Sequence, residues 1–89
     1  MKDYFVLFTF YSTHLALEFE KTLKSENLFV KLIPVPRKIS SSCGLAGKID
    51  EEEISQVKNI CDKNKIEYED IYKVFEDKSK DPEVIYNNS

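Results

Sequence analysis

The stretch YFVLFTFYSTHLALEF, residues 4–19, decides the fold that the sequence predicts. Its first half, residues 4–11, is aromatic, β-branched and apolar almost throughout, which is typical of a central strand. Ser12 or Thr13 then supplies the hydroxyl of a helix N-cap. The apolar positions of the expected helix lie along one stripe and are Leu15, Ala16, Phe19 and Leu23. The stretch therefore predicts a strand that leads directly into an amphipathic helix.

The rest of the chain repeats this arrangement of strands and a helix. A second helix is expected to begin at Asp50, with Glu53 completing a capping box, and to run to about Asn64. Asn27 suits the left-handed end of the first helix. Three further strands are expected at residues 28–35, 44–49 and 67–76. The last of these is the most polar, so we expect it at an edge of the sheet.

The order β-α-β-β-α-β predicts an α+β fold of the ferredoxin-like, split βαβ type. Such a fold has a four-stranded antiparallel sheet with both helices on one face. We expect one domain over residues 1–76 and a polar, loosely ordered tail over residues 77–89, with a short contact from Val84 to Tyr86. The other sheet face has no cover of its own. An apolar patch there, with residues such as Tyr4, Val6 and Phe8, would favour a homodimer.

Composition narrows the classes of function. The chain has 89 residues, with 13 Lys and Arg against 16 Asp and Glu, which gives a net charge of −3. An acidic chain without a basic face argues against nucleic acid as a partner. No apolar run approaches the ~20 residues that span a bilayer, and the N-terminus lacks a signal-peptide pattern. We therefore expect a cytoplasmic protein with no membrane contact, whose two cysteines stay reduced.

The loop PVPRKISSSCG, residues 34–44, is the part that the fold alone does not explain. It ends in Cys43, next to one of the two glycines of the chain. In a split βαβ fold this loop lies at the same end of the molecule as the start of the first helix. The strand after the loop pairs with the first strand, which brings Cys43 close to the N-terminus of that helix.

This location favours a reactive thiol at Cys43. Helix N-termini and cations stabilise a thiolate or another bound anion. Residues expected to stabilise the charge, or to leave the thiol accessible, are Ser12, Thr13, His14, Arg37, Ser40, Ser42 and Gly44. Cys61 lies on the apolar stripe of the second helix and is interpreted as a small buried residue. No CxxC pair or Cys/His cluster is present, so we expect no metal and no cofactor.

The motifs STH (residues 12–14), IPVPR (33–37) and SSSCG (40–44) resemble those of a family of small domains catalogued as DUF3343. That family is described as selenium/sulfur carrier-like, and the resemblance covers residues 4–75. It implies that Cys43 carries sulfur or selenium as a persulfide or selenopersulfide. It also implies donor and acceptor proteins as partners, and a carrier or accessory protein rather than a stand-alone enzyme.

Other functions fit the same residues. A small anion or metabolite bound at the helix N-terminus and Arg37 would make the protein a binding or regulatory module, with Cys43 as a bystander. A redox sensor would oxidise Cys43 to a sulfenic acid. A Cys43–His14 hydrolase remains open as well, although the sequence shows no third group that would orient the histidine.

Overall fold

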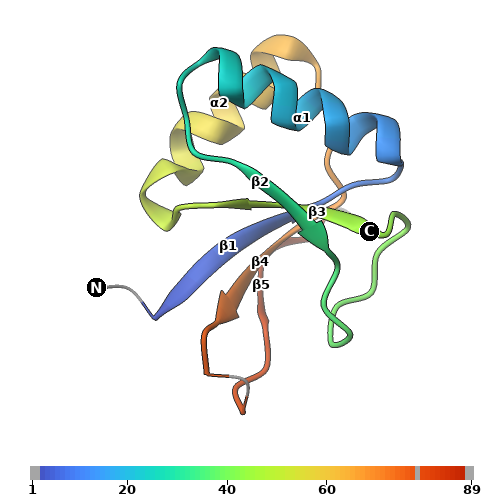
Figure 1. The fold of residues 1–89 in the computed structure, drawn as a ribbon, viewed down its shortest axis with the longest axis vertical. Coiled ribbons are helices and arrows are strands. Elements are labelled where there is room, and N and C mark those ends of the chain that lie inside the picture. Colours follow the sequence, from blue (N-terminus) through green and yellow to red (C-terminus); the bar gives the residue numbers. More distant parts are fainter. Residues whose placement is uncertain (1–2, 78, 88–89) are drawn as a thin grey trace.

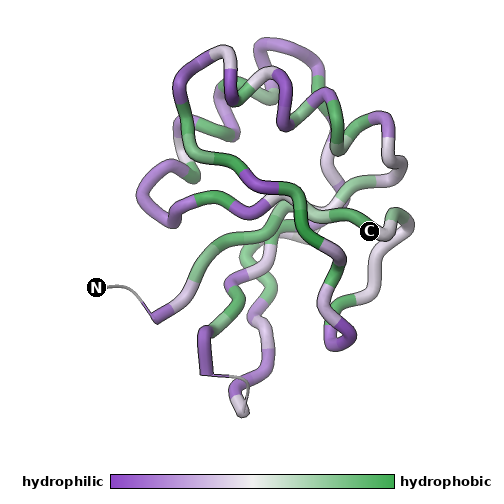
Figure 2. Tube along the Cα trace, in the orientation of Figure 1, coloured by the Kyte–Doolittle hydropathy of each residue, from purple (hydrophilic) through white to green (hydrophobic). Residues whose placement is uncertain are grey.

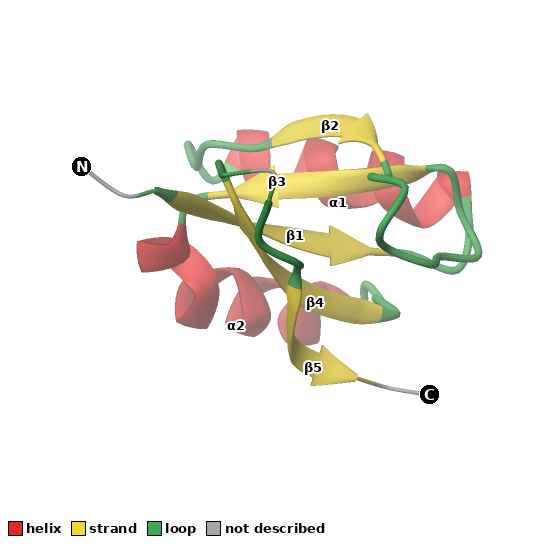
Figure 3. Ribbon diagram, turned by 90° about the horizontal axis from the view of Figure 1, so that it is seen from below, coloured by secondary structure: helices red, strands yellow, loops and turns green. Residues whose placement is uncertain are grey.

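The computed structural model of the chain describes residues 3–77 and 79–87. Five strands form one antiparallel sheet in the order β2-β3-β1-β4-β5, and two helices cover one of its faces (Figures 1 and 3). The elements are β1 (Tyr4–Thr9), α1 (Thr13–Ser25), β2 (Lys31–Pro34), β3 (Leu45–Ile49), the 3-10 helix η1 (Glu51–Glu53), α2 (Ile54–Asn64), β4 (Asp70–Phe75) and β5 (Glu83–Asn87).

The main core lies between the sheet and the helices. Phe19 of α1 packs with its ring centre 5.2 Å from that of Phe8 and 4.9 Å from that of Phe10, and all three side chains are fully buried. Val57 and Cys61 contribute the buried face of α2. Figure 2 shows the pattern behind this packing, with a hydrophobic run along β1 and alternating hydrophobic and hydrophilic residues along both helices. Burial of apolar area is the main stabilising term of such a layer.

The predicted fold class is confirmed, but the predicted number of strands is wrong. The chain is α+β with two helices and an antiparallel sheet of five strands rather than four. The additional strand, β5, comes from the segment expected to be a loosely ordered tail. It pairs with β4, and the Tyr86 ring packs 5.4 Å from that of Tyr68, centre to centre. β1 pairs with β3 as expected; the ferredoxin-like assignment stays a prediction.

The predicted edge position of the fourth strand is also wrong. β4 lies between β1 and β5, and so both of its edges are paired. Its polar residues mislead because they are only half-buried and find partners within the sheet. Lys73, for example, places its ammonium 4.2 Å from the centre of the Tyr4 ring. Such cation–π contacts let a charged residue occupy an interior strand.

The helix ends match the sequence better than the strand ends do. Ser12 caps α1 as predicted, since its hydroxyl accepts a hydrogen bond from the Leu15 N–H at 3.3 Å. Asn27 adopts the expected left-handed conformation, with φ 61°. The capping box predicted at Asp50 and Glu53 is wrong. Asp50 precedes η1 without a side-chain cap, and α2 begins only at Ile54.

Three strands are clearly shorter than predicted, among them β4, which covers Asp70–Phe75 rather than residues 67–76. The first ends at Thr9 rather than residue 11, because the chain turns there toward α1. The second covers Lys31–Pro34 rather than residues 28–35, which is the length over which it pairs with β3. The third strand, Leu45–Ile49, and the end of α2 at Asn64 lie within one residue of their predicted positions.

The second face of the sheet is covered at its centre by the loop over residues 35–44. Ile39 from this loop, Leu7 of β1 and Ala46 of β3 form a small second core, and all three are buried. Val6 and Phe8, named as candidates for this face, belong instead to the core under the helices, and their neighbours Phe5 and Leu7 face this side. Strand alternation therefore places Leu7, rather than its neighbours, beneath the loop.

We predict that Gly47→Ala destabilises the fold. A methyl group on Gly47 would lie 2.5 Å from Cε2 of Phe19, whose ring is held between Phe8 and Phe10. Overpacking of this kind costs about 1–3 kcal/mol. Urea denaturation followed by circular dichroism measures the change in the free energy of unfolding.

Gly44→Ala is the matched control, because nothing lies within 4 Å of a methyl group added there. We expect it to change stability little. Adding Phe19→Leu to Gly47→Ala should recover part of the loss, since the smaller side chain makes room for the methyl group. Equal stabilities of the two alanine variants would contradict the role given to this contact.

Candidate functional site

Three connections meet at one end of the molecule: residues 10–12, the 35–44 loop and residues 65–69 (Figure 3). The Glu69 N–H donates to the Thr9 carbonyl at 2.7 Å, which ties the third connection to the end of β1. The Cys43 sulfur lies 3.6 Å from the Thr13 hydroxyl, in the first turn of α1. The predicted meeting of the cysteine loop with the start of the first helix is therefore found.

The Cys43 thiol lies among hydrogen-bonding groups but is covered. Its sulfur accepts a hydrogen bond from the Leu45 N–H at 3.4 Å, in addition to the contact with the Thr13 hydroxyl. Only 6% of the residue is exposed. The predicted accessibility of this thiol is wrong for the conformation described, because the residue is buried with its sulfur against the start of α1 and the first residue of β3. Any reaction partner must reach the sulfur after a local movement.

Glu69 anchors the loop immediately before Cys43, and the sequence did not point to it. Its carboxylate accepts hydrogen bonds from the Ser42 hydroxyl at 2.9 Å, the Ser42 N–H at 3.1 Å and the Ser41 hydroxyl at 3.2 Å. The Ser41 oxygen in turn accepts a bond from the Cys43 N–H at 3.3 Å. Bonds to an ionised acceptor are stronger than neutral ones. The carboxylate therefore fixes the backbone on the N-terminal side of the thiol.

The cationic part of the predicted site is not assembled around the sulfur. Arg37 lines a separate cleft formed with Lys38, Lys80 and two prolines. His14 is exposed on the first turn of α1. Within residues 3–77 and 79–87, no hydrogen bond joins either residue to Cys43. The charged group that contacts the loop next to the thiol is the Glu69 carboxylate.

The remaining predicted residues serve the loop rather than the thiol directly. Ser12 caps α1, Ser42 binds Glu69, and Ser40 is exposed. Gly44 has no positive φ, and nothing lies within 4 Å of a methyl group added there, so its conformation does not require a glycine. Its carbonyl accepts a hydrogen bond from the Val35 N–H at 3.0 Å, which closes the base of the loop.

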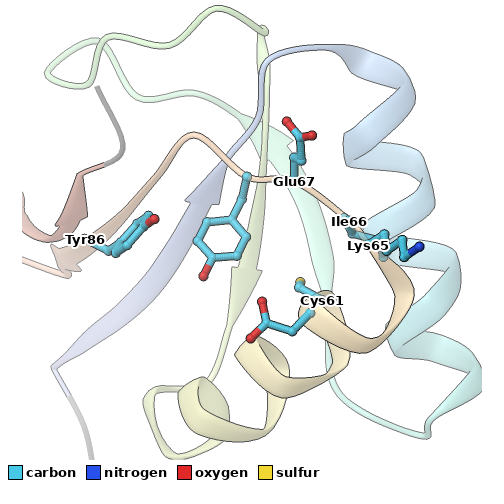
Figure 4. A pocket seen from close by; sticks show the side chains of 7 residues that line it. Cys61, Lys65, Ile66, Glu67 and Tyr86 are labelled. Atoms are coloured by element: carbon cyan, nitrogen blue, oxygen red, sulfur yellow. The ribbon is translucent and has the colours of Figure 1, made fainter.

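A second cavity, of about 440 Å³, lies beside the C-terminal end of α2 (Figure 4). It is lined by Cys61, Asp62, Lys65, Ile66, Glu67, Tyr68 and Tyr86. Burial, with a smaller contribution from Asp62, raises the pKa of the Cys61 thiol to about 12. This thiol therefore stays protonated at neutral pH, and it does not act as a nucleophile because the thiolate is the reactive form. The interpretation of Cys61 as a small buried residue is confirmed.

Metal binding and membrane insertion find no support in the described part of the chain. No three or more His, Cys, Asp or Glu side chains gather there in a way that would hold a metal ion. Neither helix within the described ranges combines the length and the apolar character needed to cross a bilayer.

These features describe a small α+β domain with one thiol held at a helix N-terminus. The family comparison agrees with that description. A model of the family described as Putative Se/S carrier protein-like matches residues 5–73, and the chain belongs to this family. The match includes both helices and the whole 35–44 loop, and it ends before β5. No curated protein and no solved structure matches the chain.

We predict that Glu69→Ala makes Cys43 more reactive. Losing bonds to a charged acceptor costs about 1.5–3 kcal/mol, enough to raise the open population of the loop by roughly tenfold or more. Alkylation by iodoacetamide, read at Cys43 by peptide mass spectrometry, should accelerate accordingly.

Glu67→Ala is the control for this measurement. It removes the same charge from an exposed side chain two residues before Glu69. We expect its alkylation rate to match that of the wild type. Glu69→Gln keeps one amide oxygen as an acceptor, so its alkylation rate should fall between those of the wild type and Glu69→Ala. Identical rates in all four proteins would contradict the anchoring role.

We also predict that Cys61 lowers stability at alkaline pH. The folded thiol keeps its proton up to a pKa of about 12, whereas the unfolded thiol loses it near the ordinary value of 9.0. The contribution of Cys61 is complete below pH 9 and is lost as the pH rises toward 12. The difference in unfolding free energy between the Cys43→Ser protein and the Cys43→Ser, Cys61→Ala protein should change over this range. A difference that stays constant from pH 8 to 10.5 would contradict it.

Proposed function

We propose that the protein carries sulfur or selenium on Cys43, as a persulfide or a selenopersulfide. Two observations support the proposal: the chain belongs to a family described as carrier-like, and its Cys43 sulfur lies 3.6 Å from the Thr13 hydroxyl at the start of α1. The second observation carries most weight, because the free N–H groups of a helix start favour a negative charge. A carrier needs a site that stabilises negative charge both when it receives the sulfur from the donor and when it passes the sulfur to the acceptor.

The transfer step needs no external oxidant. After Cys43 gives its proton to water, the thiolate attacks the terminal sulfur of a persulfide on the donor. A new S–S bond forms at Cys43, the S–S bond of the donor breaks, and the donor cysteine leaves as a thiolate. The transferred sulfur keeps its oxidation state throughout. A selenium atom in the terminal position follows the same exchange, and an acceptor thiol reverses it.

The groups around the sulfur suit both ends of this exchange. The Leu45 N–H already donates to the sulfur at 3.4 Å, and the Thr13 hydroxyl is able to donate from 3.6 Å. The same donors would stabilise the negative charge of a loaded persulfide. Because the sulfur is covered, loading requires the 35–44 loop to open, and the bonds to Glu69 set the cost of that opening.

The proposal includes the setting in which the carrier acts. Donor and acceptor proteins supply and receive the sulfur or selenium, and the cytoplasm keeps the two free cysteines reduced. A homodimer through the second face of the sheet stays a prediction. Ile39 covers the centre of that face, which leaves Phe5, Val74 and their neighbours at its margin for contact. Sedimentation at several concentrations tests it.

Loading by a cysteine desulfurase tests the proposed function. Incubating the protein with the desulfurase and cysteine should add the mass of one sulfur atom to Cys43, and a reductant should remove it. Cys43→Ser should take up none, whereas Cys61→Ala should load as the wild type does. Thr13→Val keeps the shape of the side chain without its hydroxyl, and we expect it to load more slowly.

Two results would contradict the proposal. One is unmodified protein under conditions that load a known carrier. The other is modification at Cys43 only by oxygen, as a sulfenic acid, after mild peroxide treatment, which would indicate a redox sensor instead.

A further inference from the structure

A basic cleft lies between the 35–44 loop and the connection from β4 to β5. Its volume is about 360 Å³, and it is lined by Pro36, Arg37, Lys38, Lys80 and Pro82. Both segments project from the side of the sheet opposite the helices (Figure 1). Three cations from two distant parts of the sequence thus share one concave surface, on a chain whose net charge is −3.

The cations of this cleft are exposed, although they also have partners within the protein; Lys80, for example, lies 5.2 Å from the centre of the Phe75 ring. Lys38 pairs with Asp81 at 3.0 Å, but the lysine side chain is 50% exposed and that of Asp81 is 84% exposed. Exposed pairs of this kind contribute at most about 1 kcal/mol. The pKa of nearby Asp77 is lowered, chiefly by hydrogen bonds from Ser79 and to a smaller extent by the charges of Lys80 and Lys38. The positive charges of the cleft therefore stabilise the ionised form of a carboxyl group beside it.

We propose that this cleft docks an acidic segment of the protein that exchanges sulfur with Cys43. This inference rests on the function proposed above. A small anion would be held by few groups in a tight pocket, whereas this cleft is open and draws its cations from two segments. The rigid rings of Pro36 and Pro82 give it apolar walls as well. A peptide with several carboxylates suits such a surface, and complementary charge also accelerates association.

Docking at this cleft would also act on the loop that carries Cys43. The loop is held on one side by the Lys38–Asp81 pair and on the other by the bonds from Ser41 and Ser42 to Glu69. A carboxylate of the partner competes with Asp81 for Lys38. Because that exposed pair contributes at most about 1 kcal/mol, exchanging Asp81 for a carboxylate of the partner would lower the cost of moving the loop only modestly.

Binding of a synthetic acidic peptide tests the inference on the intact protein. The probe is fluorescein-labelled hexaglutamate, and the readout is fluorescence anisotropy at low and at moderate salt. The double variant Arg37→Glu, Lys80→Glu should raise Kd by about tenfold or more, which is the effect of about 1.4 kcal/mol. Added salt should weaken binding to the wild type. The milder Arg37→Gln, Lys80→Gln variant should show an intermediate Kd.

The double variant Lys21→Glu, Lys31→Glu is the matched control. Both lysines are exposed and lie outside the cleft, and the net charge changes by the same amount. The inference is overturned if hexaglutamate binds all the proteins equally, or binds none of them. It is also overturned if inorganic phosphate at equal charge displaces the peptide fully, because the cleft would then be a site for free anions.

A second readout separates this inference from the proposed function. Inorganic polysulfide, which needs no protein docking, should load Cys43 equally in the wild type and in the Arg37→Glu, Lys80→Glu variant. Transfer from an acidic donor protein should be slower in that variant alone. Loss of polysulfide loading counts against Cys43 as the carrier, whereas equal transfer rates count against the cleft.

Discussion

The contact between the ring of Phe19 and the backbone of Gly47 is the constraint on which the rest of the structure depends. Because no side chain stands on Gly47, α1 lies close against β3, with the ring enclosed by Phe8 and Phe10. The same helix carries Thr13 at its start, and the same strand begins two residues after Cys43. The close packing of helix on strand therefore also sets the distance between the thiol and the helix N-terminus.

The charge around the thiol differs from what a simple picture of thiolate activation suggests. Arg37 and His14 were expected beside the sulfur, yet the structure places a carboxylate against the adjoining loop, Arg37 in a cleft farther along that loop, and His14 exposed on α1. The groups that contact the sulfur are neutral, namely one backbone N–H, which donates to it, and one hydroxyl. In this conformation the thiol is buried, whereas the cationic side chains of the cleft lie at the surface.

The sequence was most informative where local rules apply and least where packing decides. The order of the elements, the Ser12 cap and the meeting of Thr13 with Cys43 followed from periodicity, capping chemistry and strand pairing. The bonds from Glu69 join residues about 27 positions apart, which no local pattern encodes. Burial of Cys43 and the direction of Arg37 depend on how an irregular loop folds back. The last strand was missed because the tail around it is polar, and its short apolar run, Val84 to Tyr86, forms a strand by pairing with the free edge of β4.

The β4–β5 hairpin is attached at two places to the loop that carries the thiol. Glu69, directly before β4, accepts a hydrogen bond from Ser42 of the 35–44 loop, and Asp81, shortly before β5, pairs with Lys38 of the same loop. The Tyr68–Tyr86 ring contact braces the start of β4 against the end of β5. The hairpin thus contacts the 35–44 loop at both ends of its strands, through Glu69 at one end and Asp81 at the other. A shift of the hairpin relative to the rest of the sheet would therefore be felt by the loop that carries Cys43, more strongly through the bonds to Glu69 than through the exposed pair with Asp81.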